Sequence, residues 1–261
     1  MAQLTGNLQI IGSLDNLSFY KMRGSDKIIV RKKGGPTSKQ VKKSPRFENT
    51  RRNNKEFGGR ALAAKHISSA LFPLRFLADY NITGPINALL KPIQELDTSS
   101  DWGKKNILIS KNPGLLEGFS LNRRYLFESI VRTPVSYSLQ DQQAIVEIAE
   151  LIPGINFMAP GNYPCYQFIA VTRLVPDIVY KEERWGYQPI GKSYAAKYAK
   201  TDWLPMNTRA AATQLIIKDL PADKPEGYTM LVSLGISVGA LQGTTIEPVK
   251  YVGAARIIGV E

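Results

Sequence analysis

The segment Gly235-Ile236-Ser237-Val238-Gly239 is the pattern in this chain that comes nearest to catalytic chemistry. It matches G-x-S-x-G, in which a serine nucleophile stands on a sharp turn between a strand and a helix. A strand-like run precedes it, but residues 241–245 favour no helix. In that fold the catalytic histidine follows the serine, whereas the only histidine, His66, lies far upstream. We therefore interpret the segment as a glycine-bent strand and predict no catalytic residue and no enzymatic activity.

The other residues that could carry chemistry are too few to form a centre. His66 stands beside Lys65 on an expected helix, without a second His or a Cys nearby to share a metal. The single cysteine, Cys165, excludes an intrachain disulfide and lies in an apolar run that predicts a buried thiol. The acidic pairs, Glu182 with Glu183 and Asp219 with Asp223, fall in expected surface loops. We predict no metal site and no cofactor.

The charge of the chain is concentrated near its N-terminus. Residues 21–65 contain fifteen Lys or Arg against three acidic residues, while the rest of the chain holds nineteen of each and is neutral. A basic segment on a neutral body indicates where an acidic partner or a polyanion would bind. The residues predicted to make such contacts are Arg31, Lys32, Lys33, Lys39, Lys42, Lys43, Arg46, Arg51, Arg52 and Lys55.

Short strands and then helices are expected to position these cations. Residues 8–11 resemble a strand, and residues 17–22 and 27–31 resemble a hairpin joined by a turn at 23–26. Ser44-Pro45 is typical of a helix start with Ser44 as the cap, and apolar residues then recur at helical spacing as far as residue 71. Gly58-Gly59 predicts a kink, a break or a close approach of another backbone. A second helix is expected over residues 83–96, with a loop at 97–101.

From residue 106 onward the pattern favours strands separated by Gly and Pro turns. The expected strands are 106–110, 134–139, 144–148, 163–174, 178–181, 211–218, 228–237 and 249–258. Many strands with few long helical patterns indicate an antiparallel sandwich or barrel. The fold class expected is mainly β (α+β), with an antiparallel β-sandwich body, an N-terminal hairpin and a short helical module. The expected domains are 1–35 for the N-terminal strands and hairpin, 36–102 for the basic arm and helical module, and 103–261 for the sandwich.

Bulk composition bounds the class of protein. The 261 residues are 43% hydrophobic and 21% charged, which is typical of a folded globular chain. The longest apolar runs are far too short to cross a bilayer, and residues 1–14 lack the pattern of a Sec signal peptide. We expect a protein that stays in the cytoplasm or leaves the cell by another route.

A resemblance is visible in the N-terminal region. It rests on Gly12-Ser13-Leu14-Asp15-Asn16-Leu17-Ser18-Phe19-Tyr20, on Ile29-Val30-Arg31-Lys32-Lys33-Gly34-Gly35, and on the stretch from Ser44-Pro45-Arg46-Phe47 through Phe57-Gly58. Together these segments resemble a family of Bacteroidota proteins known as a domain of unknown function, mainly over residues 10–70. The resemblance implies no activity, substrate or catalytic residue.

Two functions remain open from the sequence. The first is a non-enzymatic structural or self-assembling protein, such as a coat, tube or filament subunit, that uses the basic arm for contacts between subunits. The alternative is a protein that binds the phosphate backbone of nucleic acid through residues 21–65. Phe57 is expected to anchor the helix in the core. A basic and aromatic stretch over residues 192–203 places Tyr194 and Tyr198 one helical turn apart, where core packing or an interface is favoured over base stacking.

Overall fold

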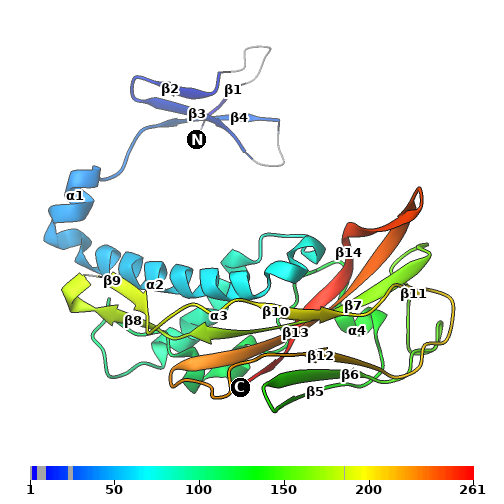
Figure 1. Ribbon diagram of the computed structural model, residues 1–261. Helices are drawn as coiled ribbons and strands as arrows, with labels where there is room; N and C mark the ends of the chain where they lie inside the picture. Colours follow the sequence, from blue (N-terminus) through cyan, green and yellow to red (C-terminus); the bar gives the residue numbers. More distant parts are fainter. Residues whose placement is uncertain (1, 5–9, 23–25, 185) are drawn as a thin grey trace. The chain divides into compact units, whose positions relative to one another are not determined.

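A four-stranded antiparallel sheet forms most of the first of two units, residues 1–51 (Figure 1). The computed structural model describes residues 2–4, 10–22, 26–184 and 186–261. The strands follow the order β1-β4-β3-β2. Their bounds are Ala2–Leu4 (β1), Gly12–Leu14 (β2), Leu17–Lys21 (β3) and Ile28–Lys32 (β4). The predicted hairpin is therefore confirmed as β3 and β4, with Phe19 opposite Val30.

The strand expected at 8–11 is wrong in its described part, because Ile10 and Ile11 have no regular structure and the strand begins at Gly12. Its first residues, and most of the turn expected at 23–26, lie outside the described residues.

A short helix that the sequence pattern missed follows the sheet. Helix α1 (Ser38–Lys43) begins with a capping box, in which the Thr37 hydroxyl accepts the Gln40 N–H and the Gln40 side chain accepts the Thr37 N–H. Ser44 ends this helix by donating its N–H to the Gln40 carbonyl. Its side chain makes no capping hydrogen bond, so the prediction of Ser44 as an N-cap is wrong.

The predicted long helix is confirmed, and it is continuous. A 3₁₀ turn, η1 (Pro45–Phe47), leads into α2 (Glu48–Ala70), which runs without a break through Gly58-Gly59. The predicted break is therefore wrong, whereas a close approach is present at Gly59: a Cβ there would lie 2.7 Å from the ring of Tyr187, so a side chain and not a backbone comes close. The second predicted helix is confirmed as α3 (Thr83–Glu95).

Two antiparallel sheets form the body of the second unit, residues 52–261. The central sheet has the order β10-β7-β13-β14, with β11 also paired to β7, and the smaller sheet has the order β12-β6-β5. A two-stranded ribbon joins β8 to β9. The bounds are Val135–Gln140 (β5), Gln143–Ile148 (β6), Cys165–Pro176 (β7), Ile178–Lys181 (β8), Gly186–Pro189 (β9), Lys197–Lys200 (β10), Leu204–Pro205 (β11), Thr213–Ile217 (β12), Tyr228–Gln242 (β13) and Thr245–Val260 (β14).

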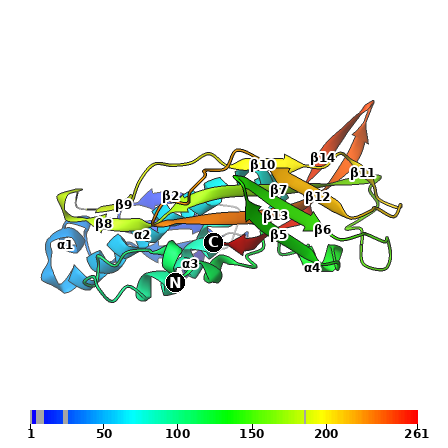
Figure 2. The same ribbon diagram turned by 60° about the horizontal axis from the view of Figure 1, so that its bottom comes forward.

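The central sheet is buried on both faces. One face packs on β5, β6 and β12 through a cluster that includes Phe168, Leu234 and Val146, and this is the predicted β-sandwich (Figure 2). The other face packs on α2, α3 and the 3₁₀ segment η2 (Phe72–Leu77) through a second cluster that includes Ile67 and Leu90. Strand β7 is consequently buried at every residue. Residues 52–102 thus share one compact unit with the sandwich.

Strands hold 38% of the residues and helices 26%, which makes the protein mainly β as expected.

The strand expected at 106–110 is wrong: Ile107 makes one isolated bridge to Ile178, and the chain then forms the 3₁₀ turn η3 (Ile109–Lys111). The remaining short elements are η4 (Pro113–Leu116), α4 (Phe127–Ile130) and η5 (Glu182–Arg184). Among the described residues no helix is both long and apolar enough to cross a membrane.

Candidate interaction surfaces

The G-x-S-x-G segment lies inside a strand and not on a turn. Gly235 to Gly239 belong to the buried centre of β13, which continues to Gln242 and then returns as β14 without a helix. Ser237 is fully buried. A Cβ on Gly235 would lie 2.6 Å from Leu74, so glycine lets η2 approach the sheet. The pairing of β13 with β14 shifts register between Ser237 and Gly239, so the ladder is irregular at the second glycine of the motif.

His66 lies on α2 near a buried arginine on β7. Burial lowers the pKa of His66, and the charge of Arg173 lowers it further. The Arg173 guanidinium donates to the Ser69 hydroxyl at 2.6 Å and to the Ser193 hydroxyl at 2.7 Å. Among the described residues no group of three His, Cys, Asp or Glu side chains could hold a metal ion.

Cys165 is buried at the start of β7, as predicted from its apolar surroundings. Burial raises the pKa of its thiol, and its sulfur lies 3.7 Å from the Gly239 carbonyl oxygen. A thiol of this kind is a packing residue, because the reactive thiolate is disfavoured.

Most of the predicted contact residues are exposed on the first unit. Lys39, Lys42 and Lys43 share one face of α1, because residues three and four apart are neighbours on a helix. Arg31, Lys32 and Lys33 follow one another at the end of β4, where the Lys33 amine donates to the Asp15 carbonyl. Arg46 lies in η1 and is also exposed. None of Lys32, Lys39, Lys42, Lys43 and Arg46 makes an ion pair with any residue in the described part of the chain.

Arg51, Arg52 and Lys55 also make contacts of their own. The Arg51 guanidinium donates to the carbonyls of Val41 and Ser44, both at 2.8 Å, and so holds the C-terminal end of α1. Arg52 lies over the Trp102 ring, with 5.5 Å from the guanidinium carbon to the ring centroid. The Lys55 amine lies 5.7 Å from the ring centroid of Tyr180. These residues hold local structure as well as carrying charge.

The first unit also exposes large apolar side chains. The exposed fractions of Ile11, Leu14 and Met22 are 68%, 63% and 52%. Its buried hydrophobic residues, within the described part, are Phe19, Ile28 and Ile29. This unit therefore presents both apolar and cationic surface.

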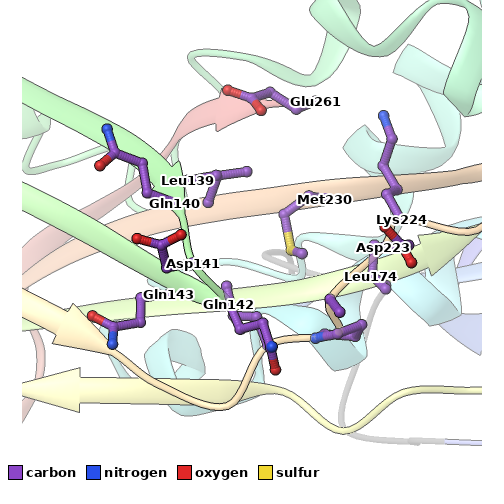
Figure 3. Close-up of a pocket in the computed structure, with 13 residues that line it drawn as sticks. Leu139, Gln140, Asp141, Gln142, Gln143, Leu174, Asp223, Lys224, Met230 and Glu261 are labelled. Carbon is purple, nitrogen blue, oxygen red and sulfur yellow. The ribbon is translucent and has the colours of Figure 1, made fainter.

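An acidic pocket opens at one end of the sandwich (Figure 3). It has a volume of about 230 Å³ and lies between the β5–β6 turn, the segment before β13, and the end of β14. Leu139, Leu174 and Met230 give it an apolar floor, and the carboxylates of Asp141, Asp223 and Glu261 stand around it with one cation, Lys224. Asp141 and Gln142 both have positive φ, so a tight two-residue turn presents that carboxylate.

A second concavity of about 660 Å³ lies between α2, α3 and the loop that follows α3. Two exposed aromatic residues line it, Phe57 (57% exposed) and Trp102 (43% exposed), together with Asn53, Glu56, Arg60 and Lys105. The prediction that Phe57 is a core anchor is therefore wrong. Sequence reasoning missed this groove because its walls come from segments some fifty residues apart and match no motif.

The basic and aromatic stretch over residues 192–203 is extended and not helical. Tyr198 lies in β10 and is exposed, whereas Tyr194 precedes the strand and packs edge-on against Tyr228 with ring centroids 5.4 Å apart. The predicted helical spacing of the two rings is wrong. Of the two rings only Tyr194 packs against the core, where Ala196 and Ala199 of the same stretch also pack.

Comparison with known proteins assigns no function to these surfaces. No protein-family model matches the chain, and no curated protein matches it. The function must therefore be argued from the surfaces themselves.

Proposed function

We propose that this protein is a non-enzymatic structural protein that assembles with further copies of itself through its basic N-terminal unit. The proposal rests on one observation: the N-terminal unit buries few apolar side chains in its own core and exposes several large ones to solvent. The resemblance of residues 10–70 to a Bacteroidota family is likewise a proposal and adds no activity.

The size of the N-terminal sheet supports a need for a partner. Two of its four strands, β1 and β2, are three residues long and form its two edges. A unit of 51 residues buries a small fraction of its surface and is marginally stable alone, so association would contribute a large share of its stability. Cys165 lies outside the unit, so a disulfide within it is excluded. Covering Ile11, Leu14 and Met22 would remove apolar surface from water.

Charge complementarity favours a second copy as the partner. The N-terminal unit holds eleven Lys or Arg against three acidic residues. The acidic pocket of the body offers Asp141, Asp223 and Glu261 over an apolar floor. Its volume suits one lysine side chain, which has an apolar stem and a cationic head. A contact from the arm of one copy to the pocket of the next joins two different surfaces, and such contacts build rings or filaments.

The test is the mass of nuclease-treated protein in solution, measured by light scattering at low and high salt. We expect particles larger than one chain that contain no nucleic acid. Replacing Lys32, Lys33, Lys39, Lys42 and Lys43 by Gln should leave a cooperatively folding protein and lower the mass. A protein that stays monomeric at every concentration and salt would contradict the proposal.

The alternative, binding to the phosphate backbone of nucleic acid through residues 21–65, would give a different result. Purified protein would then carry nuclease-sensitive nucleic acid. The logarithm of its affinity for duplex DNA would fall linearly with the logarithm of salt, with a slope of about −0.9 for each phosphate contacted. The five-lysine variant would show a shallower slope.

A further inference from the structure

We propose that the groove between α2 and α3 binds a ligand that combines an anionic phosphate with a stackable aromatic base, as in a nucleotide or a single strand of nucleic acid. The groove lies wholly in the second unit, so this inference is independent of assembly through the N-terminal unit. It also differs from backbone binding by residues 21–65, because its essential contacts are aromatic rings.

The first support is an exposed indole that is held in place before any ligand arrives. The Trp102 ring nitrogen donates to the Asn53 side-chain oxygen at 3.1 Å, and the guanidinium of Arg52 lies against the ring. Gly103 follows with φ at +95°, and its N–H donates to the Glu56 carboxylate at 2.7 Å. A Cβ at Gly103 would lie 2.9 Å from the Arg52 side chain, so this close approach requires glycine. A ring fixed in this way loses little conformational entropy when a base stacks on it.

The second support is an arginine oriented by buried amides. Arg60 donates through Nε to the Asn87 side-chain oxygen at 3.3 Å and through a terminal nitrogen to the side-chain oxygen of Gln94. Gln94 is fully buried and donates to the Lys105 carbonyl at 2.8 Å. The guanidinium also lies 5.9 Å from the ring centroid of Phe57, the other exposed aromatic residue of the groove. Arginine held in one orientation suits phosphate better than a free chain would.

The third support is the balance of charge on the groove walls. Arg60, Lys91 and Lys105 line the groove against two carboxylates, Glu56 and Glu95. The Glu95 carboxylate lies 3.6 Å from the Lys91 amine, and Glu56 accepts the Gly103 N–H. Lys91 and Glu95 balance each other, and Arg60 with Lys105 outweighs Glu56, so the groove walls carry an excess of one positive charge. An uncharged sugar could stack on the aromatic rings, but the positive charge of the groove would not strengthen its binding.

The same chemistry could come from a free nucleotide or from a strand, and the experiment separates them. Nuclease-treated full-length protein is titrated with a fluorescently labelled oligothymidylate, and fluorescence anisotropy reports binding. Unlabelled AMP, a longer oligothymidylate, duplex DNA and an uncharged chitin oligosaccharide then serve as competitors. We expect the oligothymidylate to bind and duplex DNA to compete poorly, because its bases are already stacked. Competition by AMP at a similar concentration identifies a nucleotide site, and competition by the strand alone identifies a strand site.

Matched variants assign binding to the groove. Phe57→Ala and Trp102→Leu should each weaken binding roughly five-fold or more, since stacking of one base is worth about 1–3 kcal/mol and about 1.4 kcal/mol is ten-fold. Phe72→Ala removes a phenylalanine outside the groove that is more exposed than Phe57, and it should leave binding unchanged. The mass of the protein in solution should not change in any of these variants. Unchanged binding in both groove variants, equal competition by duplex DNA, or competition by the oligosaccharide alone would overturn the proposal.

Discussion

The half-buried His66 and the buried Arg173 place two cationic residue types close together on the helix-facing side of the central sheet. The Arg173 guanidinium donates to two neutral serine hydroxyls, and no ion pair joins it to a carboxylate in the described part of the chain, so its positive charge acts on His66. Burial is the larger cause of the lowered pKa of His66, and the nearby charge of Arg173 adds to it, so the imidazole favours its neutral form.

Arg173→Met is predicted to raise the pKa of His66, because it removes a positive charge that disfavours the imidazolium. The pKa should stay below the ordinary value of 6.5, since burial is the larger cause. The chain has a single histidine, so an NMR titration of its ring protons gives one unambiguous curve. Lys65→Met, which removes a weaker contributor, should give a smaller rise. An unchanged or lower pKa in Arg173→Met would show that the two side chains do not interact.

Asp97 fixes the loop that follows α3 and therefore the wall that carries Trp102. Its carboxylate accepts the Ser99 N–H and hydroxyl, at 3.0 and 2.6 Å, and the Asn106 N–H at 2.7 Å. Burial alone would raise the pKa of Asp97, but these hydrogen bonds outweigh it and lower the pKa to about 2. The folded state thus binds this proton less readily than the unfolded state, whose pKa is near 3.8.

The stability contributed by Asp97 is predicted to be complete above about pH 4 and to be lost as the pH falls toward 2. Asp97→Asn should lower the free energy of unfolding at neutral pH by about 1–3 kcal/mol, because hydrogen bonds to a charged acceptor are replaced by weaker ones. The variant's free energy of unfolding should also fall less steeply than that of the parent as the pH drops from 4 toward 2. Urea unfolding between pH 2 and neutral pH measures both effects. Asp101→Asn in the same loop, which alters an exposed side chain, should do neither.

At the scale of elements, α2 shows how small residues set the distance between a helix and its neighbours. Its buried positions are Gly59, Ala63, Ala64, Ile67 and Ala70, so only one of them is a large side chain. The helix can therefore lie close against the sheet side of the unit and against Tyr187.

Gly58→Ala and Gly59→Ala are predicted to have opposite effects on stability. A Cβ at Gly58 meets nothing within 4 Å, so alanine should stabilise the helix by about 0.5–1 kcal/mol through its higher propensity. A Cβ at Gly59 would lie 2.7 Å from the Tyr187 ring, and the resulting overpacking should cost about 1–3 kcal/mol. Urea denaturation of the two variants provides the comparison, and equal effects would refute this account of the helix.

The sequence predicted the strands and helices whose apolar pattern lies within the element itself. Alternating apolar residues between turns located β6, β7, β8 and β13 to within a few residues, and helical spacing located α2 and α3. The pattern failed where packing decided the structure. The helical spacing selected the face with Phe57, whereas the buried face carries Gly59 and alanines, because a close neighbour leaves room only for small residues.

The candidate sites were harder to predict than the elements. The basic segment is a property of composition and was visible from the sequence. Strand β10 was missed because Lys197–Lys200 is half charged, and it pairs with β7 through its backbone. The groove with Trp102 depends on hydrogen bonds between α2 and a loop near residue 103, and no local signal encodes such a contact. Contacts between residues far apart in the chain cannot be predicted from the local pattern of a single sequence.

At the scale of the whole molecule, assembly requires the cations of one copy to meet the acidic pocket of another. Lys42 and Lys43 make no ion pair with a described residue, and neither do Asp141 and Asp223 in the pocket. A contact between them would be sensitive to charge and would weaken as salt screens exposed groups.

Charge reversal is predicted to abolish assembly on either side and to restore it when both sides are reversed. Asp141→Lys with Asp223→Lys leaves a cationic arm facing a cationic pocket, and Lys42→Asp with Lys43→Asp leaves two anionic surfaces. Each double variant should therefore have a lower mass than the parent protein at low salt, by sedimentation velocity. An equimolar mixture of the two should recover a higher mass, because each arm again meets a pocket of opposite charge. Asp202→Lys with Glu247→Lys, which reverses two exposed carboxylates outside the pocket, should assemble like the parent. If the mixture stays as small as its components, the arm and the acidic pocket are not partners.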